Sequence, residues 1–152
     1  MSQSSERAIH ALSSGATADA IAIATDAAAA GDADARFLLA QWHLTGSHLP
    51  RDLPEARRLL RAATEAGHED AALTEVALTA NGSGGPVDWP GALSLLRAAA
   101  DRFGGPARDD LALVLSMDID EHGWPKSLPE PEILGRNYQV KRYRQLLAPQ
   151  EC

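Results

Sequence analysis

The stretch PRDLPEARRLLRAA at residues 50–63 is repeated as PVDWPGALSLLRAA at residues 86–99, with nine of fourteen positions identical. The two stretches are 36 residues apart (86 minus 50). The same offset relates Gly31 to Gly67. It also aligns residues 18–31, ADAIAIATDAAAAG, with residues 54–67. A fixed period of about 20–50 residues is the signature of stacked repeat units. The sequence therefore predicts two full units, with half a unit before them and half a unit after.

Each unit has the pattern of two helices. We expect the first helix over residues 34–45, where apolar side chains recur at helical spacing and Gly46 can end the helix at positive φ. We expect the second over residues 54–66, with Asp52 as the N-cap, a proline in the first turn and Gly67 after the last turn. The helix pair, joined by short turns, is therefore the predicted building block.

A single helix pair cannot bury both of its faces, so neighbouring pairs must stack. We predict an all-α fold, a short α-solenoid of about three antiparallel helix pairs over residues 1–117. Only 5% of residues are aromatic and alanine is abundant, so small side chains should let the helices approach closely. We expect Trp42 and Trp89 to pack in the core, and burial of Leu59 or Leu95 to contribute about 1.5–3 kcal/mol each.

The segment DARFLLAQWHLTGSHLPRDLPEARRLLRAATEAGHEDA, residues 34–71, resembles the Sel-1-like repeat, a relative of the tetratricopeptide repeat. The resemblance extends over residues 18–107. It implies a non-catalytic interaction scaffold that holds a protein partner or protein substrate on the solenoid surface, typically on its concave face. The residues that define the repeat are Gly31, Ala35, Gly46, Asp52, Ala56, Ala63, Gly67, Ala71, Gly82, Asp88, Ala92 and Ala99.

The sequence departs from the family's pattern in three places. Ala40 and Val76 stand where glycine is usual, and Glu75 stands where leucine is usual. Phe103 moves the closing glycine one place on, to Gly104. We therefore expect the same fold with less regular packing in the second unit.

Charge and composition argue against several classes of protein. The formal net charge of -7 disfavours binding to nucleic acid or to an anionic membrane, since either needs a basic surface. The single cysteine, Cys152, allows no disulfide within the chain, and nothing favours an oxidising compartment. There is no signal-peptide pattern and no run of about 18 apolar residues. We predict a cytoplasmic protein without a membrane span, and the oligomeric state stays open.

Three groups of residues have the composition of metal sites. HED at residues 68–70 has the H-x-D spelling of a non-haem iron site, with His122 as a third ligand further along the chain. DIDEH at residues 118–122 offers carboxylates and an imidazole, and His43 and His48 flank a glycine. We interpret the HED stretch as a helix start with a solvent-facing histidine, because acidic residues suit a first turn, and the other groups as solvated loop residues. We thus predict no catalytic residue, metal site or cofactor in this chain.

The pattern changes after residue 117. Residues 118–135 contain three prolines and predict an extended linker. Residues 136–152 alternate like a strand and would begin a second, truncated domain. Their end resembles the start of the catalytic domain of prolyl 4-hydroxylase-like 2-oxoglutarate/Fe(II) oxygenases. The matching residues are Leu147, Pro149, Glu151 and Cys152.

This second resemblance implies a longer parent enzyme that binds Fe(II) and 2-oxoglutarate in a catalytic domain beyond the present chain. The repeats would then form its non-catalytic N-terminal part. Two alternatives stay open. One is a free-standing adaptor that ends naturally at Cys152. The other, a weaker one, is a nucleic-acid-binding module that uses the basic C-terminal residues Arg136, Lys141, Arg142 and Arg144, which alternate with tyrosines.

Overall fold

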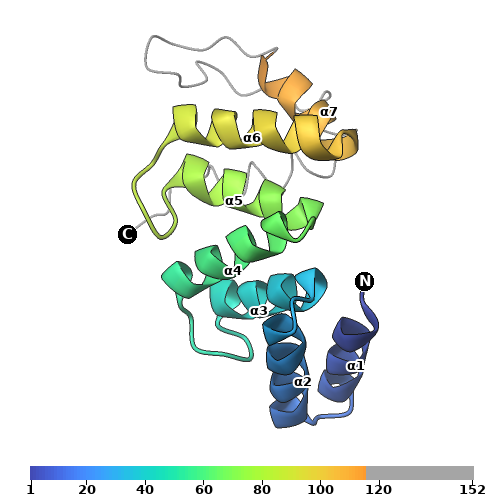
Figure 1. Ribbon diagram of the computed structural model, residues 1–152. Coiled ribbons are helices and arrows are strands. Elements are labelled where there is room, and N and C mark those ends of the chain that lie inside the picture. The colour runs from blue at the N-terminus through green and yellow to red at the C-terminus, as the bar shows by residue number, and fades with distance from the viewer. Residues whose placement is uncertain (116–152) are drawn as a thin grey trace. The chain divides into compact units, whose positions relative to one another are not determined.

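The computed structural model describes residues 1–115 of the chain. Within this range the residues form seven helices and no strand, as predicted for this part (Figure 1). None of these helices has the length and apolar character of a membrane span. The predicted linker and the predicted strand-like segment lie outside the described residues. The helices are α1 (Gln3–Ser13), α2 (Thr17–Ala29), α3 (Ala33–Thr45), α4 (Leu53–Glu65), α5 (Glu69–Asn81), α6 (Trp89–Phe103) and α7 (Gly105–Leu115).

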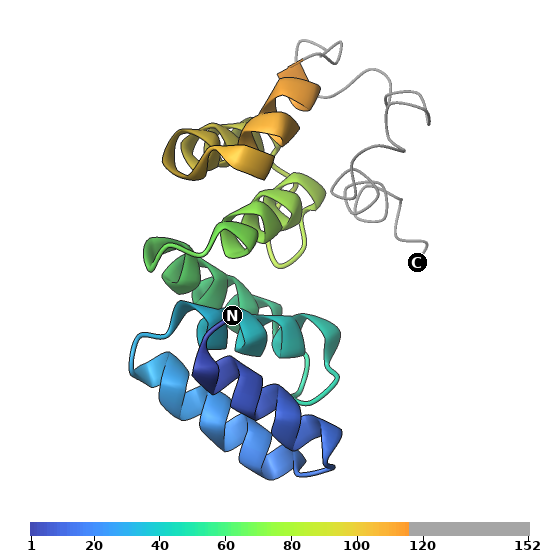
Figure 2. The same cartoon turned by 90° about the vertical axis from the view of Figure 1, so that its right-hand side faces the viewer.

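The chain divides into two compact units. The first, Met1–Ala72, contains α1 to α4 and the start of α5. In it α1 runs antiparallel beside α2, and α3 packs against both α2 and α4 (Figures 1 and 2). The second unit begins at Leu73 and contains the rest of α5, then α6, which packs against α7. The predicted helix pairs are therefore present within the units.

The helices recur at the offset of the sequence repeat. α2 and α3 begin at residues 17 and 33, and α4 and α5 begin 36 residues later, at 53 and 69. α6 follows α4 at the same offset but has 15 residues where α2 and α4 have 13. Phe103 extends it, and Gly104 ends it at a φ of 72°. The predicted shift of the closing glycine is thus confirmed.

The loop inside each repeat keeps the same hydrogen bonds. The side chains of Asp52 and Asp88 accept the backbone N–H three residues on, at 3.0 and 2.8 Å, so both are N-caps. The backbone N–H of Asp52 donates to the carbonyl of His43 at 3.1 Å. That of Asp88 donates to the carbonyl of Thr79 at 3.0 Å. These bonds fix the start of α4 and α6 against the end of the preceding helix.

Alanine makes most of the core of the first unit. Leu60 is a fully buried large side chain, and Trp42 is buried at 4% exposure, as predicted. Side chains this small let neighbouring helices pack closely. The alanines of α2, α3 and α4 that have no exposed surface are Ala20, Ala24, Ala35, Ala40, Ala56 and Ala63.

Leu95 does not take the buried position predicted for it. Its equivalent in α4, Leu59, is 6% exposed, whereas Leu95 is 40% exposed. In α6 the adjacent Leu96 is the buried leucine, with an exposed fraction of 2%. α6 therefore buries one of its two adjacent leucines, whereas α4 buries both Leu59 and Leu60.

The 36-residue period does not predict α1, because subtracting 36 from the first residue of α3, 33, gives a position before the chain begins. The helix starts at Ser2, whose Oγ accepts the N–H of Ser5 at 3.3 Å. Ser5 and Ala8 face inward and are buried. α1 contacts α2 and α3 and so completes the first helix pair (Figure 2).

Alanine substitutions at two glycines should distinguish the loss of stability caused by backbone strain from the loss caused by steric overlap. Gly67 and Gly82 have φ values of 97° and 75°. A Cβ at Gly67 would meet nothing within 4 Å, whereas one at Gly82 would lie 2.7 Å from Cγ2 of Val87 and 2.9 Å from its backbone nitrogen. We expect Gly67→Ala to lower the free energy of unfolding by about 1–2 kcal/mol through its left-handed backbone alone. Gly82→Ala should lower it by about 1–3 kcal/mol more through overpacking.

Urea unfolding followed by far-UV circular dichroism measures both losses of stability. Equal losses in the two variants would contradict the close approach of Val87 to the Gly82 backbone.

Candidate functional site

An open pocket of about 470 Å³ lies in the first unit, against one face of α3. Asp34, Phe37, Leu38 and Gln41 line it from that helix, at the i, i+3, i+4, i+7 spacing of a single helical face. We call this site the α3 pocket. Its other walls come from α1 and from the start of α5, namely Met1, Ser5, Ile9, Gly67, His68, Glu69 and Asp70.

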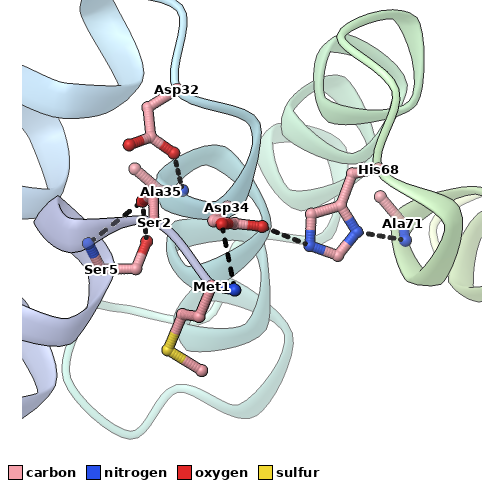
Figure 3. Close-up of polar contacts among 8 residues, drawn as sticks. All are labelled: Met1, Ser2, Ser5, Asp32, Asp34, Ala35, His68 and Ala71. Carbon is pink, nitrogen blue, oxygen red and sulfur yellow. Dashed lines mark hydrogen bonds and ion pairs between the residues drawn. The ribbon is translucent and has the colours of Figure 1, made fainter.

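Asp34 and His68 meet in the α3 pocket. Nε2 of His68 lies 3.2 Å from Oδ1 of Asp34. Oδ2 of the same carboxylate lies 3.7 Å from the terminal ammonium of Met1. Figure 3 shows Asp34 between these two groups, so that α1, α3 and the start of α5 come together at one carboxylate.

The other ring nitrogen of His68 caps α5. Nδ1 accepts the backbone N–H of Ala71 at 3.2 Å, just as Oδ1 of Asp32 accepts the N–H of Ala35 at 3.0 Å one repeat earlier (Figure 3). An accepting nitrogen carries no proton, so this hydrogen-bond network assigns the single proton of a neutral ring to Nε2, which donates it to Asp34. Both nitrogens are thereby engaged. The ring therefore has no lone pair left for a metal.

The predicted position of His68 is partly right. Glu69 and Asp70 lie in the first turn of α5, as expected. The predicted solvent-facing orientation is wrong, because the His68 side chain is only 13% exposed. Its ring lies between Asp34 and Phe37, and the centroids of the Phe37 and His68 rings are 4.3 Å apart. Two partners that are distant in sequence therefore hold this histidine inward.

The structure does not bring the other predicted histidines into a shared site. Nδ1 of His43 lies 3.0 Å from the carbonyl oxygen of Pro50, and the ring of His48 packs edge-on against Trp42 with centroids 5.3 Å apart. Within residues 1–115 no group of three metal-ligating side chains occurs. Several predicted residues lie outside this range, namely the DIDEH group with His122, the basic residues Arg136, Lys141, Arg142 and Arg144, and the oxygenase-like residues Leu147, Pro149, Glu151 and Cys152.

The residues that define the repeat build the scaffold, and Gly67 alone among them lines the α3 pocket. Their alanines are buried, their glycines end helices or turn loops, and their aspartates cap helices. The repeat pattern does not single out Asp34, Phe37 and Gln41 as a group. Their common spacing on a predicted helix could have indicated a shared face. Ile9 could not have been found in this way, because α1 lies outside the repeat.

Asp32 caps α3 and so fixes the helix that carries the pocket. Burial alone would raise the pKa of its carboxyl group. Hydrogen bonds from the Ser2 side chain and from the backbone N–H groups of Ala35 and Asp34 act against burial. Together with the charge of Arg36 they bring the pKa below its ordinary value of 3.8. The ionised carboxylate therefore stabilises the folded state.

This shift predicts how the Asp32→Asn variant responds to pH. Asparagine keeps the cap but not the charge at the helix N-terminus, so wild type should be more stable by about 0.3–1 kcal/mol at pH 7. Because the folded pKa is the lower one, this advantage is present above pH 3.8 and is lost as the pH falls through the folded value. Urea unfolding of both proteins between pH 7 and pH 3 measures the difference. A gap that widens as the pH falls would contradict the assignment.

Comparison with known proteins identifies the fold. No protein-family model and no curated protein matches the sequence. Among solved structures, a Sel1 repeat protein from Oxalobacter formigenes is similar, with a TM-score of 0.59 and 28% identity over 74% of this chain. A protective antigen of uropathogenic Escherichia coli strains that displays an SLR fold is also similar, with a TM-score of 0.58 and 20% identity over 86% of this chain. The alignments span 44% and 26% of those two proteins. The predicted all-α repeat fold of Sel1 type is thus confirmed.

Proposed function

We propose that this chain is a non-catalytic helical-repeat module that binds a segment of a partner protein in the α3 pocket. The supporting observation is the pocket itself, where Ile9, Phe37 and Leu38 lie beside the polar groups of Asp34 and Gln41. Concave sites with apolar walls and a few polar groups are the usual places of ligand binding. Ile9 is 39% exposed, so the pocket leaves apolar surface uncovered that a partner can bury.

Two further observations support a protein partner and a binding role. An open pocket along one helix face can take the side chains that a partner helix or extended segment presents at regular spacing. The resemblance to Sel1-like repeats implies the same class of partner. His68 is poorly placed for acid–base catalysis, because a proton on its Nδ1 would end the hydrogen bond that caps α5.

Site-specific photo-crosslinking in cells of the source organism tests this function. The photoreactive residue p-benzoylphenylalanine is placed at Gln41, on the pocket wall, and in a control protein at Ala22, on the exposed surface of α2. We expect the pocket position to give a discrete adduct that mass spectrometry maps to one segment of one protein. The added variant Phe37→Ala should abolish this adduct, because it removes the aromatic wall. The same adducts from both positions, or none from Gln41, would contradict the proposal.

We propose further that the module is the N-terminal part of a 2-oxoglutarate/Fe(II) oxygenase of the prolyl 4-hydroxylase-like type, so that the bound segment would be a substrate. The support is the C-terminal motif that ends at Cys152, outside the described residues. An antibody against the repeats should then detect a native product heavier than 16.1 kDa. That product should decarboxylate 2-oxoglutarate with Fe(II), and purified residues 1–152 should not.

A native band at 16.1 kDa would instead support the free-standing adaptor. The nucleic-acid-binding alternative has the net charge of -7 against it.

A further inference from the structure

We propose that the α3 pocket recognises a basic segment, in which a lysine or arginine stands next to an apolar residue. This inference rests on the proposed binding of a protein segment and names its chemistry. Among the residues that line the pocket, three are carboxylates and none is a lysine or arginine. Electrostatic complementarity of this kind selects partners and speeds their association. The carboxylates are Asp34, Glu69 and Asp70.

Asp34 has two partners in the pocket, His68 and the terminal ammonium of Met1. The Nε2 of His68 contacts Asp34, while its Nδ1 accepts the hydrogen bond that caps α5. The cation that approaches Asp34 is the ammonium of Met1, 3.7 Å from Oδ2, and the Met1 side chain is 55% exposed. A cationic nitrogen thus already lies against this carboxylate. A lysine or arginine of a partner can make the same contact by displacing this ammonium.

Glu69 and Asp70 extend the negative charge along the pocket wall. Both lie in the first turn of α5, where acidic side chains suit the partial positive charge of the helix N-terminus. They follow directly on His68 in the chain, and both side chains line the pocket with Asp34. An anionic ligand, such as a phosphate or an acidic peptide, would have to enter against this charge.

The apolar part of the pocket explains why a bare cation is not the expected ligand. Phe37, Leu38 and Ile9 form its walls, and they come from two different helices. Lysine and arginine carry a long aliphatic stem below the charged group, which can bury against such walls while the head reaches a carboxylate. A metal ion gains nothing from apolar walls, and His68 has no lone pair to offer it. An apolar neighbour of the cationic residue can fill the rest of the space.

Selection from random peptides tests this inference with the full chain. A phage-displayed library of dodecapeptides is panned on wild type after depletion on Phe37→Ala, so that only peptides requiring the pocket remain. Should Phe37→Ala lose helicity, Gln41→Lys replaces it, because it adds a competing cation to the pocket wall. Enriched peptides are then synthesised and their affinities are measured by fluorescence anisotropy.

Two charge variants of equal size separate the pocket from the general acidity of the chain. The pocket variant is Glu69→Gln with Asp70→Asn. The matched control is Asp26→Asn with Glu65→Gln, which removes two charges from exposed positions in α2 and α4 that do not line the pocket. We expect the pocket variant to weaken binding by about tenfold or more, and the control to change it by less than about twofold. Binding should also weaken as salt is raised, since the charges are partly exposed.

Enriched peptides that pair lysine or arginine with an apolar residue, and that respond to the pocket variant only, would support the inference. Peptides that require the pocket but lack a basic residue, or an equal effect of both charge variants, would overturn it and leave the proposed function standing. If no peptide requires the pocket and the photo-crosslinking at Gln41 also fails, both proposals fall. If no peptide requires the pocket, the partner segment mapped by photo-crosslinking decides the inference. A segment without a basic residue would overturn the inference alone, and a segment with one would uphold it.

Discussion

Close contact between helices through alanine is the constraint on which the first unit depends. Ala35 and Ala40 turn one face of α3 toward its neighbours with no exposed surface, and Ala20 and Ala56 do the same from α2 and α4. A larger side chain at any of these positions would push α3 outward, because packed interiors have no spare volume. The residues Asp34, Phe37, Leu38 and Gln41 lie on the opposite face of α3, and that face lines the pocket.

Arg36 links α3 to both α2 and α4 by hydrogen bonds. Its Nε donates to the carbonyl of Ala28 at 3.1 Å, and its Nη1 donates to the carbonyl of Ala62 at 3.2 Å. These carbonyls lie in the last turns of α2 and α4, where the helix dipole favours a cation. One α3 side chain therefore joins the ends of two helices that the sequence places 36 residues apart. The next repeat has Ala72 at this position, so the link belongs to the first unit alone.

The 36-residue period predicted the caps and helix ends that recur in each unit, and it missed the residues that occur in one unit alone. Asp52 and Gly46 have counterparts one repeat later, and their roles as cap and helix end follow from local chemistry. The α3 pocket needs Ile9, from a helix outside the repeat, and His68, whose counterparts are an aspartate and a glycine. Leu95 shows the same limit, because the repeat pattern gives it the place of Leu59, although Leu95 is 40% exposed and Leu59 is 6% exposed. Residues that act across repeats carry no periodic signal.

His68 shows why one repeat position changed its residue type. Its counterpart Asp32 caps α3 with a carboxylate, and a carboxylate at position 68 would cap α5 in the same way. It would also bring a second negative charge close to Asp34, which lies 3.2 Å from the histidine ring. An imidazole can accept on one nitrogen and donate from the other, so it starts the helix and binds Asp34 at once. The same side chain thereby begins α5 and contacts the carboxylate of Asp34, which lines the α3 pocket.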